Sequence, residues 1–277
     1  MQAEWAGART WASGVGDSAL AHLGKAPVSV AKFEDYLARL QGYLRGEDVP
    51  FDADADVDAL GLADRPQTSR MHWVRPGKYP KVPVEVTATG PKVMGLAAIH
   101  GDRVVLAVGA DIERLRWGIN VAREAAEAQG RDPDELQFGA YVNVIVHDDI
   151  EKAKQLGEGG ISLFTRFSSM HGNVVGPTSE TDQRVFEAVH DAYNMNEHSR
   201  AGSQQAATIP GDFAARFGVL GPASECIDRL GAIAELGIDR LVVVGPSIGA
   251  SQGEAREAEA RFAEDVLPKV KAMGIGA

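Results

Sequence analysis

The chain contains very little cysteine, because Cys226 is the only one among its 277 residues. A single cysteine excludes an internal disulfide and a zinc site built from several thiolates. It also favours a cytoplasmic protein, since disulfides are common in secreted domains and rare in the cytosol. Cys226 falls inside an expected helix at 224–236, where we predict a buried, small apolar residue rather than a reactive thiol.

Long apolar runs and basic charge are scarce as well. No stretch approaches the ~20 apolar residues of a membrane-spanning helix, and residues 1–5 lack the basic and hydrophobic parts of a secretory signal. Asp and Glu outnumber Lys and Arg by 39 to 28, which gives a net charge of −11. This balance argues against binding to nucleic acid or to an acidic membrane, because both need clustered cations.

Signatures of metal binding are also missing. The 7 histidines show neither H-x-x-x-H nor H-E-x-x-H spacing, so we predict no metal site. The acidic stretch at 52–58 lacks the glycine and the terminal glutamate of a calcium loop, and we expect a solvated surface there.

Along the chain, the sequence pattern repeats in the order apolar strand, glycine-containing turn and amphipathic helix. The predicted strands are 9–15, 82–88, 103–108, 137–146 and 238–244. The predicted helices are 27–44, with Ser29 as its cap, 91–99, 111–129, 149–157, 224–236 and 256–273. Valine-rich strands joined by helical crossovers predict a parallel sheet covered on both faces. An open doubly wound sheet and part of a barrel both fit these strands.

Two segments interrupt the repeating order. Residues 48–81 carry the acidic stretch and several prolines, and we expect a long loop there. Residues 161–211 are rich in Ser, Asn, His and Gly, with helical fragments such as 181–192. Neither segment has the low complexity of a linker, so we predict a single domain, 1–277, with an insertion at about 161–211.

In parallel α/β folds, ligands bind at the carboxyl ends of the strands, where three turns are rich in small residues. The first turn holds Gly16, Asp17 and Ser18. Its glycines allow close approach of backbone to a ligand, and Asp17 is a candidate ring contact or proton donor. The alternative is a tight turn in which Asp17 or Ser18 caps the next helix.

The second turn is Thr89-Gly90-Pro91, which leads from a strand into a helix. Proline is favoured at the first helical position, and the free N–H groups of the first turn, together with the helix dipole, can hold an anion. The alternative is simply a well-formed start of a helix. The third turn, Val108-Gly109, carries a weaker signal, because a small residue after a strand is usually only a turn.

Several segments resemble luciferase-like oxidoreductases. Residues 14–19 resemble the fourth βα unit of that superfamily, and 82–92 resemble its fifth strand and phosphate turn. Residues 101–106 are similar to its sixth strand, and 217–226 with 237–241 to its C-terminal end. Within the superfamily the chain looks closest to methylenetetrahydromethanopterin reductase-like members that use a deazaflavin.

The resemblance implies an α/β fold of the (β/α)₈ TIM-barrel type that lacks the first three strands, so that about five are visible. It implies hydride transfer to a small organic substrate from the reduced deazaflavin coenzyme F420 or from FMN. It places Gly16, Asp17 and Ser18 beside the ring, with Asp17 as a candidate catalytic acid. It places Thr89, Gly90 and Pro91 on the cofactor phosphate, with Val108 and Gly109 next to them.

The same resemblance implies that residues 161–211 cover the active site and that the protein is a homodimer. Two alternatives to this hydride-transferring oxidoreductase stay open. The first is an FMN-dependent monooxygenase, and the second is a non-catalytic partial barrel that only binds a phosphate-bearing ligand or a partner chain.

Overall fold

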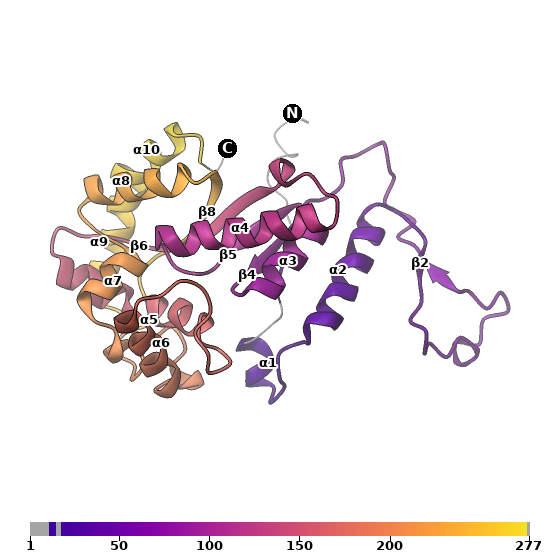
Figure 1. Ribbon diagram of the computed structural model, residues 1–277, viewed down its shortest axis with the longest axis horizontal. Coiled ribbons are helices and arrows are strands. Elements are labelled where there is room, and N and C mark those ends of the chain that lie inside the picture. Colours follow the sequence, from indigo (N-terminus) through magenta and orange to yellow (C-terminus); the bar gives the residue numbers. More distant parts are fainter. Residues whose placement is uncertain (1–10, 15–17, 276–277) are drawn as a thin grey trace.

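A parallel β-sheet forms the framework of the computed structural model, which describes residues 11–14 and 18–275 (Figure 1). Its strands are β1 (Trp11–Ser13), β4 (Val84–Ala88), β5 (Arg103–Leu106), β6 (Gln137–Val146), β7 (Val219–Gly221) and β8 (Ile238–Val244). They pair in the order β1-β4-β5-β6, and β6 then pairs with both β7 and β8. The predicted parallel sheet is therefore present, and the short β7 is a strand that the sequence pattern did not reveal.

Helices surround the sheet and follow the strands in sequence. They are α1 (Ser18–His22), α2 (Val30–Leu44), α3 (Pro91–His100), α4 (Ile112–Ala128), α5 (Ile150–Phe167), α6 (Glu180–Asp191), α7 (Gly211–Phe217), α8 (Ala223–Ala234), α9 (Gln252–Arg261) and α10 (Leu267–Ala272). A π-helical turn, Phe262–Val266, joins the last two. Ser29 caps α2, as predicted, because its side chain accepts from the Lys32 N–H. No helix in the described ranges combines the length and apolar character needed to cross a membrane.

Two separate apolar clusters pack against the sheet. One joins alternate residues of the strands, such as Val84, Val104 and Phe138, to buried side chains of α2, α3, α4 and α8. The other contains Ala107 and Ile145 together with side chains of α5, α6 and α7. Burial of both faces explains why the strands have a continuous apolar character instead of a polar-apolar alternation.

The sheet curves like part of a barrel wall. Glu85 of β4 lies 3.3 Å from Arg103 of β5 and 3.2 Å from Arg240 of β8. In a flat sheet β4 and β8 would be about 14 Å apart, three spacings of ~4.8 Å. The contact between their side chains therefore requires curvature, and Glu85 is buried in the concavity.

The structure extends one predicted helix. The sequence pattern predicted the start of a helix at 149–157, and α5 continues to Phe167, inside the predicted insertion. Glycines lower helix propensity, but a Cβ on Gly157 would lie 2.9 Å from Ile145, and one on Gly160 would lie 2.4 Å from Asn143. These glycines let the helix approach β6 closely, and this tertiary contact outweighs their low propensity.

Residues 47–82, called the arm below, extend away from the body of the molecule (Figure 1). The predicted loop contains a short antiparallel pair, β2 (Val49–Pro50) with β3 (Thr68–Ser69). A single 3₁₀ turn, Asp58–Leu60, lies between these two strands.

Cys226 lies in α8 and is buried, which confirms the prediction. Burial raises the pKa of its thiol to about 11, since desolvation disfavours the thiolate. We expect Cys226 in the folded protein to react with a thiol reagent at pH 8 at least ~100-fold more slowly than in urea, because the thiolate is the reactive form. A time course of thiol labelling measures this ratio, and equal rates would contradict it.

Candidate functional site

The carboxyl ends of β4 and β5 lie side by side. The Ala107 N–H donates to the Ala88 carbonyl over 3.0 Å, which holds the chain after β5 next to the end of β4. At this edge Thr89 and Gly90 follow the end of β4, and Val108 and Gly109 come shortly after the end of β5. Two of the three predicted turns are therefore neighbours, as a parallel sheet requires.

A cavity of about 630 Å³ opens at the end of β4. Its floor is the turn Thr89–Val93, which begins α3, and one wall is the segment Ala26–Val30, which begins α2. The opposite wall belongs to the predicted insertion and its approach. Its lining residues are Phe167, Met170, His171, Asn173 and Val175. Most of the lining is apolar, and its polar side chains lie at the starts of the two helices and, as His171 and Asn173, on the opposite wall.

The N-terminus of α3 has the features of an anion site. Gly90 is its N-cap residue, no side chain caps it, and Pro91 occupies the first turn. A Cβ on Gly90 would meet nothing within 4 Å, so the space above it is open. The first N–H groups of a helix have no partner within the helix, and the positive end of the dipole favours negative charge there. The first turn carries no acidic residue, and Lys92 adds an exposed cation.

Two other helices that follow a strand start differently, whereas α8 and α9 resemble α3 in having no side-chain cap. Asp111 caps α4 by accepting from two backbone N–H groups, and Asp149 caps α5 in the same way. These aspartates neutralise the helix N-terminus from within the chain. At α3 the equivalent place has no such group, which suits an external phosphate.

Arg114 holds the insertion against the end of β5. It is 3% exposed, and its guanidinium donates to the Val108 carbonyl over 3.2 Å. It also donates to the carbonyls of Val175 and Pro177 and to the Ser168 hydroxyl, each over 2.8 Å. Desolvation lowers its pKa to about 10, so the side chain remains cationic at neutral pH. The loop that Arg114 fastens supplies one wall of the cavity.

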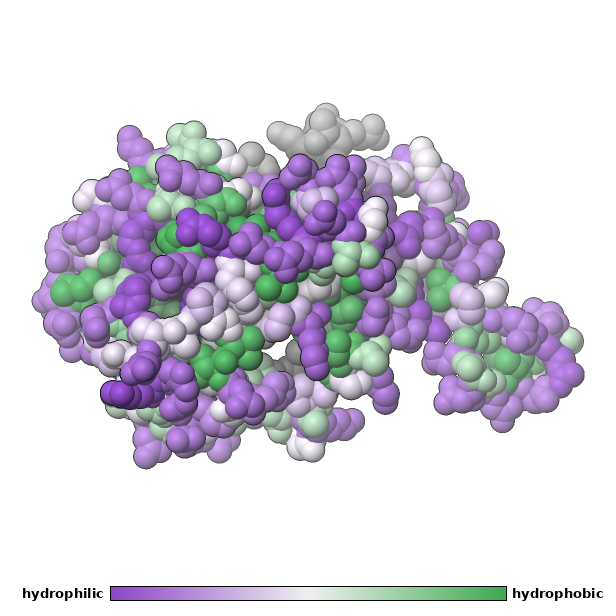
Figure 2. All heavy atoms as spheres, viewed as in Figure 1, coloured by the Kyte–Doolittle hydropathy of each residue, from purple (hydrophilic) through white to green (hydrophobic). Residues whose placement is uncertain are grey.

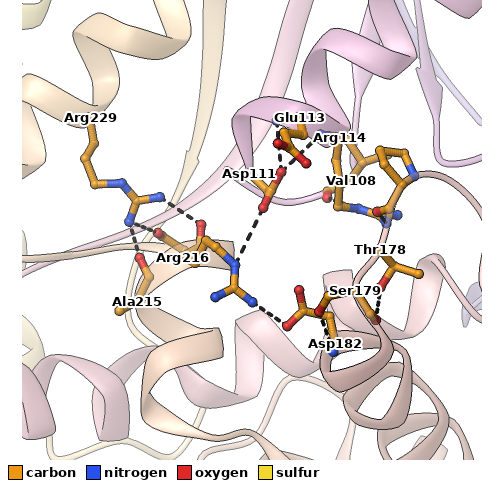
Figure 3. A network of polar contacts seen from close by, with 12 residues as sticks. Val108, Asp111, Glu113, Arg114, Thr178, Ser179, Asp182, Ala215, Arg216 and Arg229 are labelled. Carbon is orange, nitrogen blue, oxygen red and sulfur yellow. Dashed lines mark hydrogen bonds and ion pairs between the residues drawn. The ribbon is translucent and has the colours of Figure 1, made fainter.

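A second cavity, of about 670 Å³, is lined by several residues of the polar network drawn in Figure 3, among them Asp111, Asp182 and Arg216. Arg216 lies between Asp111, at 3.7 Å, and Asp182, with which it forms a close ion pair. Arg229 directs its donors at backbone carbonyls near the end of α7, including that of Arg216 at 2.8 Å. Arg216 and Arg229 already have partners, and Asp111 and Ser179 cap the nearby helices α4 and α6. This cavity is therefore a poorer anion site than the one at α3.

A G-x-S-x-G spacing at Gly245, Ser247 and Gly249 follows β8, and this spacing is typical of a hydrolase nucleophile. The structure gives Ser247 a different role. Its Oγ accepts hydrogen bonds from the N–H groups of Gly159 and Gly160, at 3.0 and 3.2 Å. Ser247 thus fastens the β8 turn to α5, and the spacing does not mark an active serine.

The structure brings together only part of the predicted site. Thr89, Gly90 and Pro91 line the 630 Å³ cavity. Val108 is buried, and a Cβ on Gly109 would lie 2.6 Å from the Phe217 ring, so these two residues do not line it. Their contact with a cofactor stays a prediction.

The predicted ring-side residues include Gly16 and Asp17, which lie outside the described residues. Ser18 is the first residue of α1, and the placement of its side chain is likewise not described. The proposed acid role of Asp17 therefore stays a prediction from the sequence.

Sequence reasoning missed Arg114. One signal was present, because a cation in the first turn of a helix faces the positive end of the dipole and is disfavoured there. The unusual position indicated a special role, but three of the four partners of Arg114 are 54 to 63 residues away, and no local pattern identifies them.

A curved, helix-covered parallel sheet with a cavity and an uncapped helix start at its carboxyl edge defines an α/β protein of the barrel class. Residues 12–240 match the luciferase-like monooxygenase family, and the chain belongs to that family. This match confirms the predicted superfamily and the (β/α)₈ TIM-barrel fold class. The hydrogen-bonded ring of strands is not closed within the described part of the chain.

Individual similar proteins agree with this family assignment. A 5,10-methylenetetrahydromethanopterin reductase of Methanolobus tindarius is 23% identical over 234 residues, which are 83% of this chain and 64% of the relative. The structure of the coenzyme F420-dependent tetrahydromethanopterin reductase of Methanopyrus kandleri matches with a TM-score of 0.61 at 16% identity, covering 94% of this chain and 73% of that chain. An F420-dependent secondary alcohol dehydrogenase matches with a TM-score of 0.61 at 19% identity, covering 96% and 71%. The chain thus spans less than two thirds of the length of the first of these relatives.

Proposed function

We propose that this chain binds a phosphate-bearing flavin or deazaflavin, FMN or coenzyme F420, at the carboxyl edge of its sheet and acts as an oxidoreductase on a small organic substrate. The observation that carries the proposal is the uncapped N-terminus of α3, which opens into the 630 Å³ cavity. The names of the relatives support the same class of cofactor, since two of them are F420-dependent enzymes.

The residues fit a phosphate group at this place. The backbone N–H groups of Lys92 and Val93 lie in the first turn of α3 and have no intrahelical partner. The Thr89 hydroxyl and the Lys92 ammonium lie on either side of Gly90 in the chain and line the same cavity. Neutralisation of a phosphate by these groups would compensate for its removal from water.

The rest of the cavity suits the organic part of such a cofactor. Val28, Phe167, Met170 and Val175 offer apolar surface next to the phosphate turn. A reduced flavin or deazaflavin supplies hydride, and the protein's task is to bind it, orient it and exclude water. The predicted acid Asp17, which follows β1 in the sequence, would deliver the accompanying proton.

An FMN-dependent monooxygenase is the second candidate, favoured by the name of the matched family. The two activities differ in their use of oxygen, because a reduced flavin reacts with oxygen readily and a deazaflavin poorly. Reoxidation of the reduced, protein-bound cofactor in air separates them. Rapid, FMN-linked oxygen consumption would favour the monooxygenase, and stability in air with F420 would favour the reductase.

Equilibrium titration of residues 1–277 with FMN, coenzyme F420 and riboflavin, followed by fluorescence, tests the proposal. We expect saturable binding of FMN or F420 at a dissociation constant of about 1–10 μM, about −8 to −7 kcal/mol. Riboflavin shares the ring of FMN and lacks its phosphate, so it should bind at least ~10-fold more weakly than FMN if the phosphate lies at α3. A folded sample that binds neither phosphate-bearing cofactor would overturn the proposal.

A further inference from the structure

The arm gathers much of the exposed apolar surface of the described chain. Trp73 is 78% exposed and Tyr79 is 66% exposed, and Leu60, Leu62 and Val82 are exposed on the same segment. Figure 2 shows apolar side chains at the surface of the extended part, surrounded by hydrophilic ones. Exposed apolar groups concentrated on an extension, with a polar surround, are typical of a protein interaction site.

The two halves of the arm carry opposite charge. Residues 52–64 contain five aspartates and no Lys or Arg, and residues 70–81 contain four Lys and Arg and no Asp or Glu. The acidic half borders a hollow of about 380 Å³, lined in part by Asp56 and Asp58. The basic half forms a groove of about 530 Å³, lined by Trp73, Arg75 and Tyr79 among others.

Some of these charges have partners within the chain. Asp52 pairs with Arg39, Asp58 with Arg65, and Lys81 with Asp102. Asp54 and Asp64 on the acidic half and Arg75 and Lys78 on the basic half are exposed. The side chain of Lys78 lies 5.3 Å from the centre of the Tyr79 ring and contributes its charge to the groove side.

We propose that the arm docks on the arm of a second copy of this chain, with the acidic half of each copy against the basic, aromatic half of the other. Leu60 and Leu62 would pack against Trp73 and Tyr79, and the aspartates would face Arg75 and Lys78. This gives an apolar centre with a charged rim, the usual anatomy of an interface.

A second copy fits the arm better than an unrelated partner does. In a two-fold interface each surface contacts its own complement, because residue i meets residue j and residue j meets residue i. Such an interface needs both signs of charge on one segment, as the arm has. A partner with a single charge would leave one half of the arm facing a like charge. The proposal depends on the arm alone and not on the cofactor.

Analytical ultracentrifugation of residues 1–277 with two charge-reversed variants tests the proposal. The first variant carries Asp54→Lys and Asp64→Lys, and the second carries Arg75→Glu and Lys78→Glu. In either variant alone both contacts of a two-fold pair become repulsive, and we expect the dimer dissociation constant to rise at least tenfold. An equal mixture of the two variants restores opposite charges at both contacts, so we expect heterodimers with about the wild-type constant.

Substitutions of apolar side chains provide an independent test of the proposal. Trp73→Ala should weaken the dimer by about 30-fold, as expected for a central aromatic residue. Ile150→Ala removes an exposed apolar side chain of α5, away from the arm, and should leave the dimer unchanged. A monomeric wild-type chain at all concentrations would overturn the proposal. A dimer insensitive to the arm variants, or a mixture that stays monomeric, would overturn it as well.

Discussion

Replacement of Gly90 by aspartate is expected to weaken binding of the phosphate-bearing cofactor by about 100-fold, equivalent to about 2.8 kcal/mol. Gly90 has φ −141°, a conformation open to any residue, and a Cβ there meets nothing within 4 Å. The new carboxylate can therefore enter the cradle without strain, cap α3 and repel a phosphate from the same N–H groups. Titration with the cofactor that wild type binds measures the loss.

Gly90→Ala is the matched control. It adds the Cβ without the charge, and we expect a change in affinity below about threefold, or about 0.6 kcal/mol. Gly90→Asp should unfold at or above the wild-type temperature, since aspartate is a favourable N-cap, and Gly90→Ala slightly below it, since alanine is a poorer N-cap than glycine. Equal cofactor affinity in wild type and Gly90→Asp would show that the phosphate does not lie at α3.

Replacement of Arg114 by methionine is expected to lower the free energy of unfolding by about 3 kcal/mol. Methionine fills much of the volume but leaves three carbonyls and the Ser168 hydroxyl without the donor that they have in the wild type. Each buried acceptor that loses its partner costs about 1–3 kcal/mol, and release of the loop to water recovers part of this. Urea unfolding followed by circular dichroism measures the difference.

Arg116→Met provides the comparison, because Arg116 is exposed on the same helix. We expect a change within about 0.5 kcal/mol for this surface residue. Hydrogen exchange should show faster exchange at 168–177 in Arg114→Met than in the control. Equal stability of the two variants would mean that Arg114 does not hold the insertion in place.

The predicted elements that agree with the structure are those whose signal is local. The strands 137–146 and 238–244 and the helix start at Pro91 were predicted correctly, because valine-rich runs and a Gly-Pro turn act within a few residues. The sequence pattern was insufficient where contacts between distant residues determine the extent of an element. The pattern did not show α5 continuing to Phe167, since the close approach of Gly160 to Asn143 is tertiary.

The candidate site divides in the same way. The predicted phosphate turn at Thr89–Pro91 is a strand end followed by a helix start, and both were predicted from adjacent residues. The wall of the cavity could not be predicted in this way, because Phe167 and Met170 belong to a segment about 80 residues further along the chain. Arg114 positions that wall through four hydrogen bonds, three of them to residues more than 50 positions away.

The class of this protein followed from its amino-acid sequence. Alternating strands and helices, a Gly-Pro turn between a strand and a helix, and the resemblance of these segments were enough for a luciferase-like α/β barrel fold, because periodicity and turn chemistry are local properties. The pattern of residues did not reveal which turns face a common cavity, that Arg114 and Phe217 cover Val108 and Gly109, or that Ser247 is structural. These outcomes depend on side chains that meet across long separations, where packing and the pairing of buried polar groups select one arrangement.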